Sequence, residues 1–177
     1  IKIIDKVISF IGSGALLTKA INFSIANGFV IEKVFCAEGD SSIPFLKRSS
    51  VDFHILDLNR LKNTFEYAEV TELKSEVMFS INNKIILPDK ILNSINFPVI
   101  NIHNGLVQSH RGLAEICVVA ALCHGEDVYG ATCHQILPNQ PVDTGRVFLQ
   151  KSFDIENHSF EWLMSKAISN CQDAFED

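Results

Sequence analysis

The feature that most constrains the fold is a strand, a glycine turn, a helix and a second strand near the start of the chain. Val7 to Ile11 reads as a buried strand that ends in Gly12-Ser13-Gly14. The next residues, ALLTKAINFSIA, place apolar side chains at helical spacing until Asn27-Gly28 ends the helix, and a strand from Val30 to Cys36 follows. This order forms a βαβ unit, whose strands are parallel. The sequence therefore predicts an α/β fold.

Segments of alternating strand and helix character continue along the chain. We expect strands at Val51–Leu56, Val77–Ile81, Val99–His103, Ala131–Leu137 and Val147–Phe153, and helices at Arg60–Ala68, Pro88–Asn93, Leu113–Cys123 and Asn157–Ala174. The last helix has an apolar side that would cover the sheet. The expected architecture is a three-layer α/β sandwich with a mostly parallel central sheet, in one domain over residues 1–177.

Composition narrows the classes of partner and compartment. A net charge of −6 and the lack of a basic stripe argue against nucleic acid as a partner. No apolar stretch is long enough for a signal peptide or a membrane span. The five cysteines are odd in number and irregular in spacing, which is typical of free thiols in a reducing cytoplasm. Because the chain begins at Ile1 rather than Met, it is also expected to be a piece of a longer protein.

Two Cys-His dipeptides bear on metal binding. Cys123-His124 and Cys133-His134 lack the CxxC spacing of zinc sites, and neighbouring side chains on a strand point in opposite directions. We therefore expect no metal.

The polar residues best suited to catalysis are Asn101, His103 and Asp143. Val99–His103 alternates as a strand, so Asn101 and His103 project from the same face at a strand end, where ligands of α/β sheets collect. An amide that donates a hydrogen bond, an imidazole that carries protons and a carboxylate that favours the charged imidazole together suit acyl transfer through an oxyanion. Each residue taken alone has a common structural explanation, such as a strand end or an Asp-x-Gly turn.

A longer pattern surrounds these residues. NIHNGLVQSHRG (residues 101–112), a following apolar helix and YGATCHQILPNQPVDTGRVF (residues 129–148) contain an Asn-x-His strand end, a loop closing in Arg-Gly, a helix, a strand and an Asp-x-Gly turn. This order resembles the folate-dependent formyltransferase family. NKIILPDKIL (residues 83–92) is similar to the family's hydrophobic segment ending in Leu-Pro. With a weaker likeness in the first βα unit, the resemblance covers nearly the whole chain.

The resemblance implies a transferase of one-carbon metabolism that uses 10-formyltetrahydrofolate as co-substrate. Asn101 would donate to the oxyanion, His103 would place an N–H on it and relay protons, and Asp143 would hold a water. Gly145 would allow a sharp turn and the approach of a ligand to the backbone. The folate would be held by two segments, made up of Asn83, Lys84, Ile85, Ile86 and Leu87 on one side and Asn139, Gln140 and Val142 on the other.

Some positions depart from the family's pattern. Lys84 replaces a small or apolar residue, and Asn104 to Gln108 replace the commoner Pro-Ser-Leu-Leu-Pro, which predicts a more mobile loop. Arg111 could bind substrate anions, although we favour a role in capping or pairing at the entrance of the helix.

The acceptor is expected to bind near Gly12, Ser13 and Gly14, where a phosphate can meet the amino end of a helix. Polar residues follow the first strand in the branch that formylates glycinamide ribonucleotide, but Ala15-Leu16 follow it here. The chain also stops soon after the core, without the second domain of the branch that formylates transfer RNA. We therefore expect a small amine acceptor, such as an amino sugar nucleotide or an amino acid.

Two alternatives to a transferase stay open at this point. One is a hydrolase that releases the formyl group to water, because the deformylating branch has the same Asn, His and Asp. The other is a non-catalytic formyltransferase-like binding domain. A homodimer or an additional domain in a longer chain is compatible with each of these functions.

Overall fold

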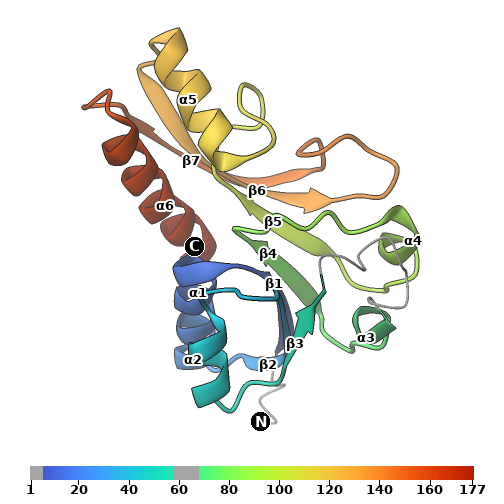
Figure 1. Cartoon of the computed structure of the whole chain (residues 1–177). Coiled ribbons are helices and arrows are strands. Elements are labelled where there is room, and N and C mark those ends of the chain that lie inside the picture. Colours follow the sequence, from blue (N-terminus) through green and yellow to red (C-terminus); the bar gives the residue numbers. More distant parts are fainter. Residues whose placement is uncertain (1–5, 58–67) are drawn as a thin grey trace. The chain divides into compact units, whose positions relative to one another are not determined.

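The computed structural model describes residues 6–57 and 68–177 of the chain. The chain packs as two compact units. The first comprises Ile1–Val99 with Leu137–Asn139, and the second comprises Ile100–Ile136 with Gln140–Asp177. Figure 1 labels the helices and strands of each unit.

The first unit alternates strands and helices. Its elements are β1 (Val7–Gly12), α1 (Gly14–Ala26), β2 (Val30–Ala37), α2 (Ile43–Arg48), β3 (Phe53–Leu56), α3 (Ala68–Thr71), β4 (Val77–Ile81) and α4 (Asp89–Leu92). The strands lie in the order β3-β2-β1-β4, and the pairs are parallel. Phe10 and Ile11 of β1 are fully buried, as expected for a central parallel strand that is covered on both faces.

The second unit contains β5 (Val99–His103, from its second residue on), α5 (Ala114–His124), β6 (Val128–Ile136), β7 (Val147–Asp154) and α6 (Phe160–Glu176). Its strands lie in the order β5-β6-β7, and β6 and β7 form an antiparallel pair. Buried residues of α5, β6 and α6 form one core, which includes Val118, Tyr129 and Leu163. The loop between β6 and β7 carries Asp143, and the loop between β5 and α5 follows His103.

The predicted α/β class with mostly parallel strands is confirmed, and the differences are local. The strand expected at Ala131 begins earlier, at Val128. Helix α2 was missed because IPFLKR is too short to show a period, although a proline in a first helical turn is compatible with helix. The helix expected at Arg60–Ala68 lies outside the described residues apart from Ala68, where α3 begins. None of the described helices is both long and apolar enough to cross a membrane.

Candidate active site

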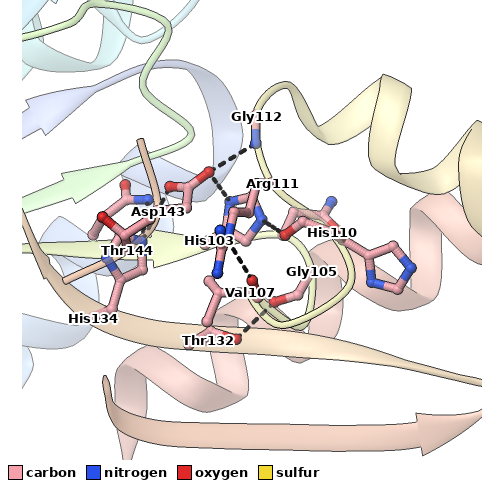
Figure 2. Close-up of polar contacts among 12 residues, drawn as sticks. His103, Gly105, Val107, His110, Arg111, Gly112, Thr132, His134, Asp143 and Thr144 are labelled. Atoms are coloured by element: carbon pink, nitrogen blue, oxygen red, sulfur yellow. Dashed lines mark hydrogen bonds and ion pairs between the residues drawn. The ribbon is translucent and has the colours of Figure 1, made fainter. Parts of the chain in front are cut away.

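The structure brings His103 and Asp143 together, although forty positions separate them in the sequence. His103 is the last residue of β5, and its Nδ1 lies 3.5 Å from Oδ2 of Asp143. Figure 2 shows the carboxylate of Asp143 directed at the ring of His103 and at the backbone of Gly112. The backbone N–H of Gly112 donates to the same oxygen, Oδ2, over 2.8 Å. Both side chains are buried.

Asn101 joins this pair through a residue that the sequence analysis did not assign to the site, His134. Nε2 of His134 lies 3.2 Å from Oδ1 of Asp143 and 3.2 Å from Nδ2 of Asn101. The His134 side chain is only 2% exposed, and it comes from β6, which lies next to β5 in the second unit. Asn101, His103, His134 and Asp143 therefore form one connected polar cluster.

His134 was missed because Cys133-His134 was weighed only as part of a metal site. The alternation of β6 carried the relevant signal, since Thr132 and His134 are two residues apart and share a face of the strand. The hydroxyl of Thr132 donates to the carbonyl of Gly105 over 2.7 Å, in the loop that follows His103. Both polar residues of this face thus serve the same site.

The environment of Asp143 keeps it ionised. Burial by itself would raise the pKa of this carboxyl, but the hydrogen bond with His134, the nearby His103 and the Gly112 N–H together hold the pKa below its ordinary 3.8. Asp143 also has φ +57°, in the left-handed region. This backbone conformation is unusual for a residue other than glycine, and it turns the carboxylate inward at the base of the β6–β7 loop.

The charge state of His103 differs from the sequence-based expectation. Burial is the largest influence, and it holds the pKa of His103 below its ordinary 6.5 even though Asp143 acts in the opposite direction. The carboxylate taken alone favours the charged ring, which is why the sequence predicted that form. In the structure the neutral imidazole is the resting form near neutral pH.

The second ring nitrogen of His103 is also engaged. Nε2 lies 2.9 Å from the carbonyl oxygen of His110, so this nitrogen carries the proton and donates it to the carbonyl. The expectation that His103 places an N–H on the oxyanion is not met in this arrangement, because the N–H of the neutral ring already has an acceptor. The nitrogen that faces Asp143 is then the basic one.

The loop from Asn104 to Gly112 folds back on itself. The Nε of Arg111 donates to the carbonyl of Val107 over 2.7 Å, so Arg111 braces the loop just before α5 (Figure 2). The hydroxyl of Tyr129 donates to the carbonyl of Asn104 over 3.0 Å. These bonds hold a loop whose lack of prolines had predicted mobility.

Gly145 has a reason to be glycine that differs from the predicted one. A β-carbon at this position would overlap the backbone carbonyl of Gln135 on β6. Glycine is thus required here by the close approach of two backbone segments.

The residues expected to hold the folate differ in their exposure and in whether their polar groups are already hydrogen-bonded. The side chain of Asn83 bonds both backbone groups of Ile85, with Nδ2 donating to the carbonyl over 2.9 Å and Oδ1 accepting from the N–H over 2.9 Å. Leu87 is buried, and Lys84 is exposed. Ile86 is 76% exposed and makes no hydrogen bond within the described part of the chain. Ile86 is therefore the position of this segment that is open to a ligand.

The second segment expected to contact the folate has residues in both units. Asn139, in the first unit, has φ +57°, and its N–H donates to Oδ1 of Asp89 at the start of α4 over 2.9 Å. Gln140 and Val142, in the second unit, are exposed. Val142 is the neighbour in sequence of Asp143, so an exposed apolar side chain precedes the buried carboxylate.

The glycine turn expected to bind the acceptor is already engaged by a carboxylate. Asp40 accepts a hydrogen bond from Ser13 Oγ and, over 3.1 Å, from the N–H of Gly14 at the start of α1. Gly12 packs against the carbonyl of Ile81, and a β-carbon there would overlap it. Asp40 therefore satisfies the amino end of α1. Separately, no group of side chains suited to hold a metal ion occurs among the residues described.

The sequence of the chain is similar to those of known proteins. The sequence profile described as "Formyl transferase" matches residues 18–172. The chain belongs to this family. Relatives include the methionyl-tRNA formyltransferase of Ehrlichia ruminantium, 31% identical over 110 residues, which are 62% of this chain and 35% of the relative. That of Caldicellulosiruptor saccharolyticus is 30% identical over 129 residues, 71% of this chain and 40% of the relative. The match thus spans well under half of each relative.

Solved structures of this family share the fold. Glycinamide ribonucleotide transformylase 1 from Symbiobacterium toebii superposes with a TM-score of 0.84, at 20% identity, over 97% of this chain and 84% of that one. A formyltetrahydrofolate deformylase from Pseudomonas syringae superposes with a TM-score of 0.83, at 18% identity, over 97% of this chain and 59% of that one. At these identities the similarity establishes the formyltransferase-like fold, and the reaction has to be argued from the site.

Proposed function

We propose that residues 1–177 form the catalytic domain of a folate-dependent formyltransferase, which moves a formyl group from 10-formyltetrahydrofolate to a primary amine of a small acceptor. The observation that supports this most is the cluster in which His103 and His134 converge on one buried carboxylate, Asp143, with Asn101 bonded to His134. This cluster supplies the donor and the proton carrier that transfer of an acyl group between nitrogens requires.

Asn101 is proposed as the donor to the oxyanion. Attack of the acceptor nitrogen on the formyl carbon places negative charge on the formyl oxygen, and an amide N–H is a neutral donor at every pH. Its Nδ2 lies 3.2 Å from Nε2 of His134, beside the buried carboxylate of Asp143. Loss of one such donor costs about 10² to 10³ in rate in a comparable oxyanion site.

His103 is proposed as the proton carrier. The attacking amine becomes an ammonium centre, whose proton passes to Nδ1 of neutral His103 and then to the folate nitrogen as the bond between that nitrogen and the formyl carbon breaks. Asp143 stabilises the imidazolium that exists between these two steps, because Oδ2 is 3.5 Å from Nδ1 and can approach once that nitrogen carries a proton. A water beside Asp143 would serve the same transfer.

The residues present fit a folate. Ile86 combines an exposed apolar side chain with backbone groups that make no hydrogen bond within the described residues, which suits a pterin recognised by backbone hydrogen bonds and apolar contact. Exposed Val142 is a second apolar candidate. Among the predicted folate contacts, Ile86 is therefore favoured over Ile85, whose backbone groups are already bonded by Asn83.

The acceptor is proposed to be a small amine. Several relatives are named methionyl-tRNA formyltransferases and several similar structures are glycinamide ribonucleotide formyltransferases, so both substrates belong in any test. The net charge of −6 disfavours capture of RNA, which depends on neutralising phosphates. The carboxylate of Asp40 at the start of α1 likewise disfavours a phosphate at Gly12 to Gly14. A cytoplasmic location, where folate and amine would be supplied, is part of this proposal.

Hydrolysis of the formyl group is the second candidate, because a similar structure is a formyltetrahydrofolate deformylase. Release of tetrahydrofolate from 10-formyltetrahydrofolate, followed spectroscopically with and without each amine, separates the outcomes. Release that depends on an amine supports the transferase, release in water alone supports the hydrolase, and no release under any condition contradicts both. The panel contains amino sugar nucleotides, amino acids, glycinamide ribonucleotide and methionyl-tRNA.

Site variants test the assigned roles. His103→Ala and Asp143→Ala should each lower turnover by about 10² or more, the range for loss of general acid–base catalysis. His124→Ala removes a histidine that is 72% exposed and is the matched control. Circular dichroism checks that each variant is folded. Turnover at the wild-type rate in a folded His103→Ala protein would refute the proposed role.

A further inference from the structure

His110 is a buried histidine whose backbone, rather than its side chain, meets the active site. Its carbonyl oxygen accepts the hydrogen bond from Nε2 of His103 over 2.9 Å. Figure 2 shows the His110 ring pointing away from His103, on the far side of the loop. The residue is only 3% exposed, so the ring is enclosed by protein.

Two contacts hold the His110 ring. Its centroid lies 4.7 Å from that of Tyr129, and its Nε2 lies 3.0 Å from Oε2 of Glu126, just beyond the end of α5. The approach to Glu126 is off the direction of a hydrogen bond, so the two atoms are in close polar contact without one. The ring is thereby tied to β6 and to the turn after α5.

Packing alone does not account for a histidine here. The Nδ1 of His110 is buried and has no hydrogen-bond partner among the described residues. An unpaired buried polar atom is destabilising, and an apolar ring of similar size would make the contact with Tyr129 without that cost. Unlike an apolar ring, an imidazole at this position can also make a polar contact with Glu126.

Other bonds hold the loop on both sides of His110, including those from Arg111 Nε to the carbonyl of Val107 and from the N–H of Gly112 to Asp143. The carbonyls of Asn104 and Gly105 accept from Tyr129 and Thr132, and the backbone N–H of His110 donates to the carbonyl of Leu106 over 2.7 Å. These bonds do not involve the side chain of His110, whose contacts with Glu126 and Tyr129 hold the residue that carries the carbonyl acceptor.

That carbonyl decides which nitrogen of His103 carries the proton. The carbonyl at 2.9 Å from Nε2 favours the form protonated there, whereas the carboxylate at 3.5 Å from Nδ1 favours the form protonated on the other nitrogen. A small displacement of the carbonyl would remove its advantage, and the proton would move to Nδ1. The nitrogen that faces Asp143 would then no longer be a base.

We propose that His110 is a positioning residue, which through Glu126 and Tyr129 holds its own carbonyl on Nε2 of His103 and so keeps Nδ1 free to take up the proton. The kinetic consequence of this assignment rests on the proposed function. The position of the proton does not, because it is measured without turnover.

The test measures the ring nitrogen signals of His103 by NMR in the whole chain with ¹⁵N-labelled histidine, at a pH where the ring is neutral. Wild type should show the proton on Nε2. In His110→Phe, which keeps a ring against Tyr129, and in Glu126→Ala, the population should shift toward Nδ1. Glu126→Gln retains an oxygen near the ring and should restore part of the wild-type signal.

His124→Ala is the matched control, because His124 is exposed and lies 3.7 Å from the other oxygen of Glu126. It should leave the His103 signals unchanged. A proton on Nδ1 in wild type, or an unchanged Nε2 proton in both His110→Phe and Glu126→Ala, overturns the proposal. If one of these two variants does not fold, the other and Glu126→Gln decide the outcome.

Kinetics provide the second readout. In His110→Phe and Glu126→Ala, kcat should fall about tenfold, the effect of losing one hydrogen bond of ordinary strength, while KM for 10-formyltetrahydrofolate stays within about twofold. A change confined to KM would contradict a positioning role. If wild type proves inactive with every acceptor, the proposed function fails, whereas the NMR result still tests the position of the proton.

Discussion

Asp143 receives polar groups from three segments: the end of β5 through His103, β6 through His134, and the loop before α5 through the N–H of Gly112. Two of these are imidazoles: that of His103, the proposed proton carrier, and that of His134, which also contacts Asn101. A single substitution at Asp143 should therefore disturb both parts of the proposed chemistry. Effects of variants at His103 and His134 should be less than additive for the same reason.

The direction of the His103 pKa gives a pH dependence. In the proposed mechanism neutral His103 is the base, and burial holds its pKa below 6.5, so kcat/KM should fall as the pH is lowered through a midpoint below 6.5. Asp143 raises this pKa, so the midpoint measured from the residual activity of Asp143→Asn, or from the NMR titration of its His103, should move lower. A wild-type midpoint above 6.5 would contradict the neutral resting state.

Gly105 is predicted to be essential to the geometry of His103. A β-carbon there would lie 2.8 Å from Cβ of His110 and 2.9 Å from Nε2 of His103, and φ is +153°. Gly105→Ala should therefore displace the ring from its carbonyl acceptor and lower kcat by about tenfold or more. Gly28→Ala is the control, because Gly28 also has positive φ, +81°, but has no atom within 4 Å of the added carbon. Equal kcat values in the two variants would argue against the clash.

The residues that could be predicted are those whose chemistry is visible without tertiary structure. Asn101 and His103 share a strand face, and Asp143 belongs to a recognisable turn, so all three were named from the sequence. His134 and His110 were not, because one was paired in sequence with a cysteine and the other acts through its backbone carbonyl. Because every residue has a backbone carbonyl, the residue type does not reveal which carbonyl accepts a hydrogen bond.

At the scale of elements, predictability follows length and periodicity. The long helix α6 and the strands β1, β4 and β5 lie close to where the apolar pattern put them. The six-residue helix α2 was missed, and β6 extends further toward its start than expected, because a short turn such as Glu126-Asp127 does not reveal where pairing with β7 begins. The first and last residues of a helix or strand are set by the segments it packs or pairs with, rather than by local sequence preference.

Helix α6 is predicted to stabilise the unit that contains the site. Leu163 is fully buried in the core with Val118 and Tyr129, and Tyr129 in turn bonds the loop after His103. Leu163→Ala should lower the free energy of unfolding by about 2 to 5 kcal/mol, as for other large-to-small core changes. Ile168→Ala, at an exposed position of the same helix, should cost much less. Denaturant unfolding measures both, and equal losses would contradict this packing.

At the scale of the whole molecule, the fold is retained at low sequence identity. The superposition on a transformylase with a TM-score of 0.84 at 20% identity means that most side chains have changed while the pattern of strands and helices has not. The family was visible in the sequence because its polar motif lies at strand ends, where the fold places ligands. The acceptor was not visible, because recognition of an acceptor depends on loops that vary within one fold.

The same buried groups predict how global stability depends on pH. The folded-state pKa of His103 lies below 6.5, so as the pH falls through this region the unfolded chain takes up a proton that the folded chain does not. The free energy of unfolding should therefore decrease as the pH falls from about 6.5 toward the lowered pKa. Asp143 acts with the same sign at lower pH, because its pKa lies below 3.8. Denaturant unfolding at a series of pH values, with wild type and His103→Asn, should show a flatter dependence below pH 6.5 for the variant. His124→Ala, at an exposed site, should retain the wild-type slope, and identical slopes for wild type and His103→Asn would show that His103 is not held neutral by the fold.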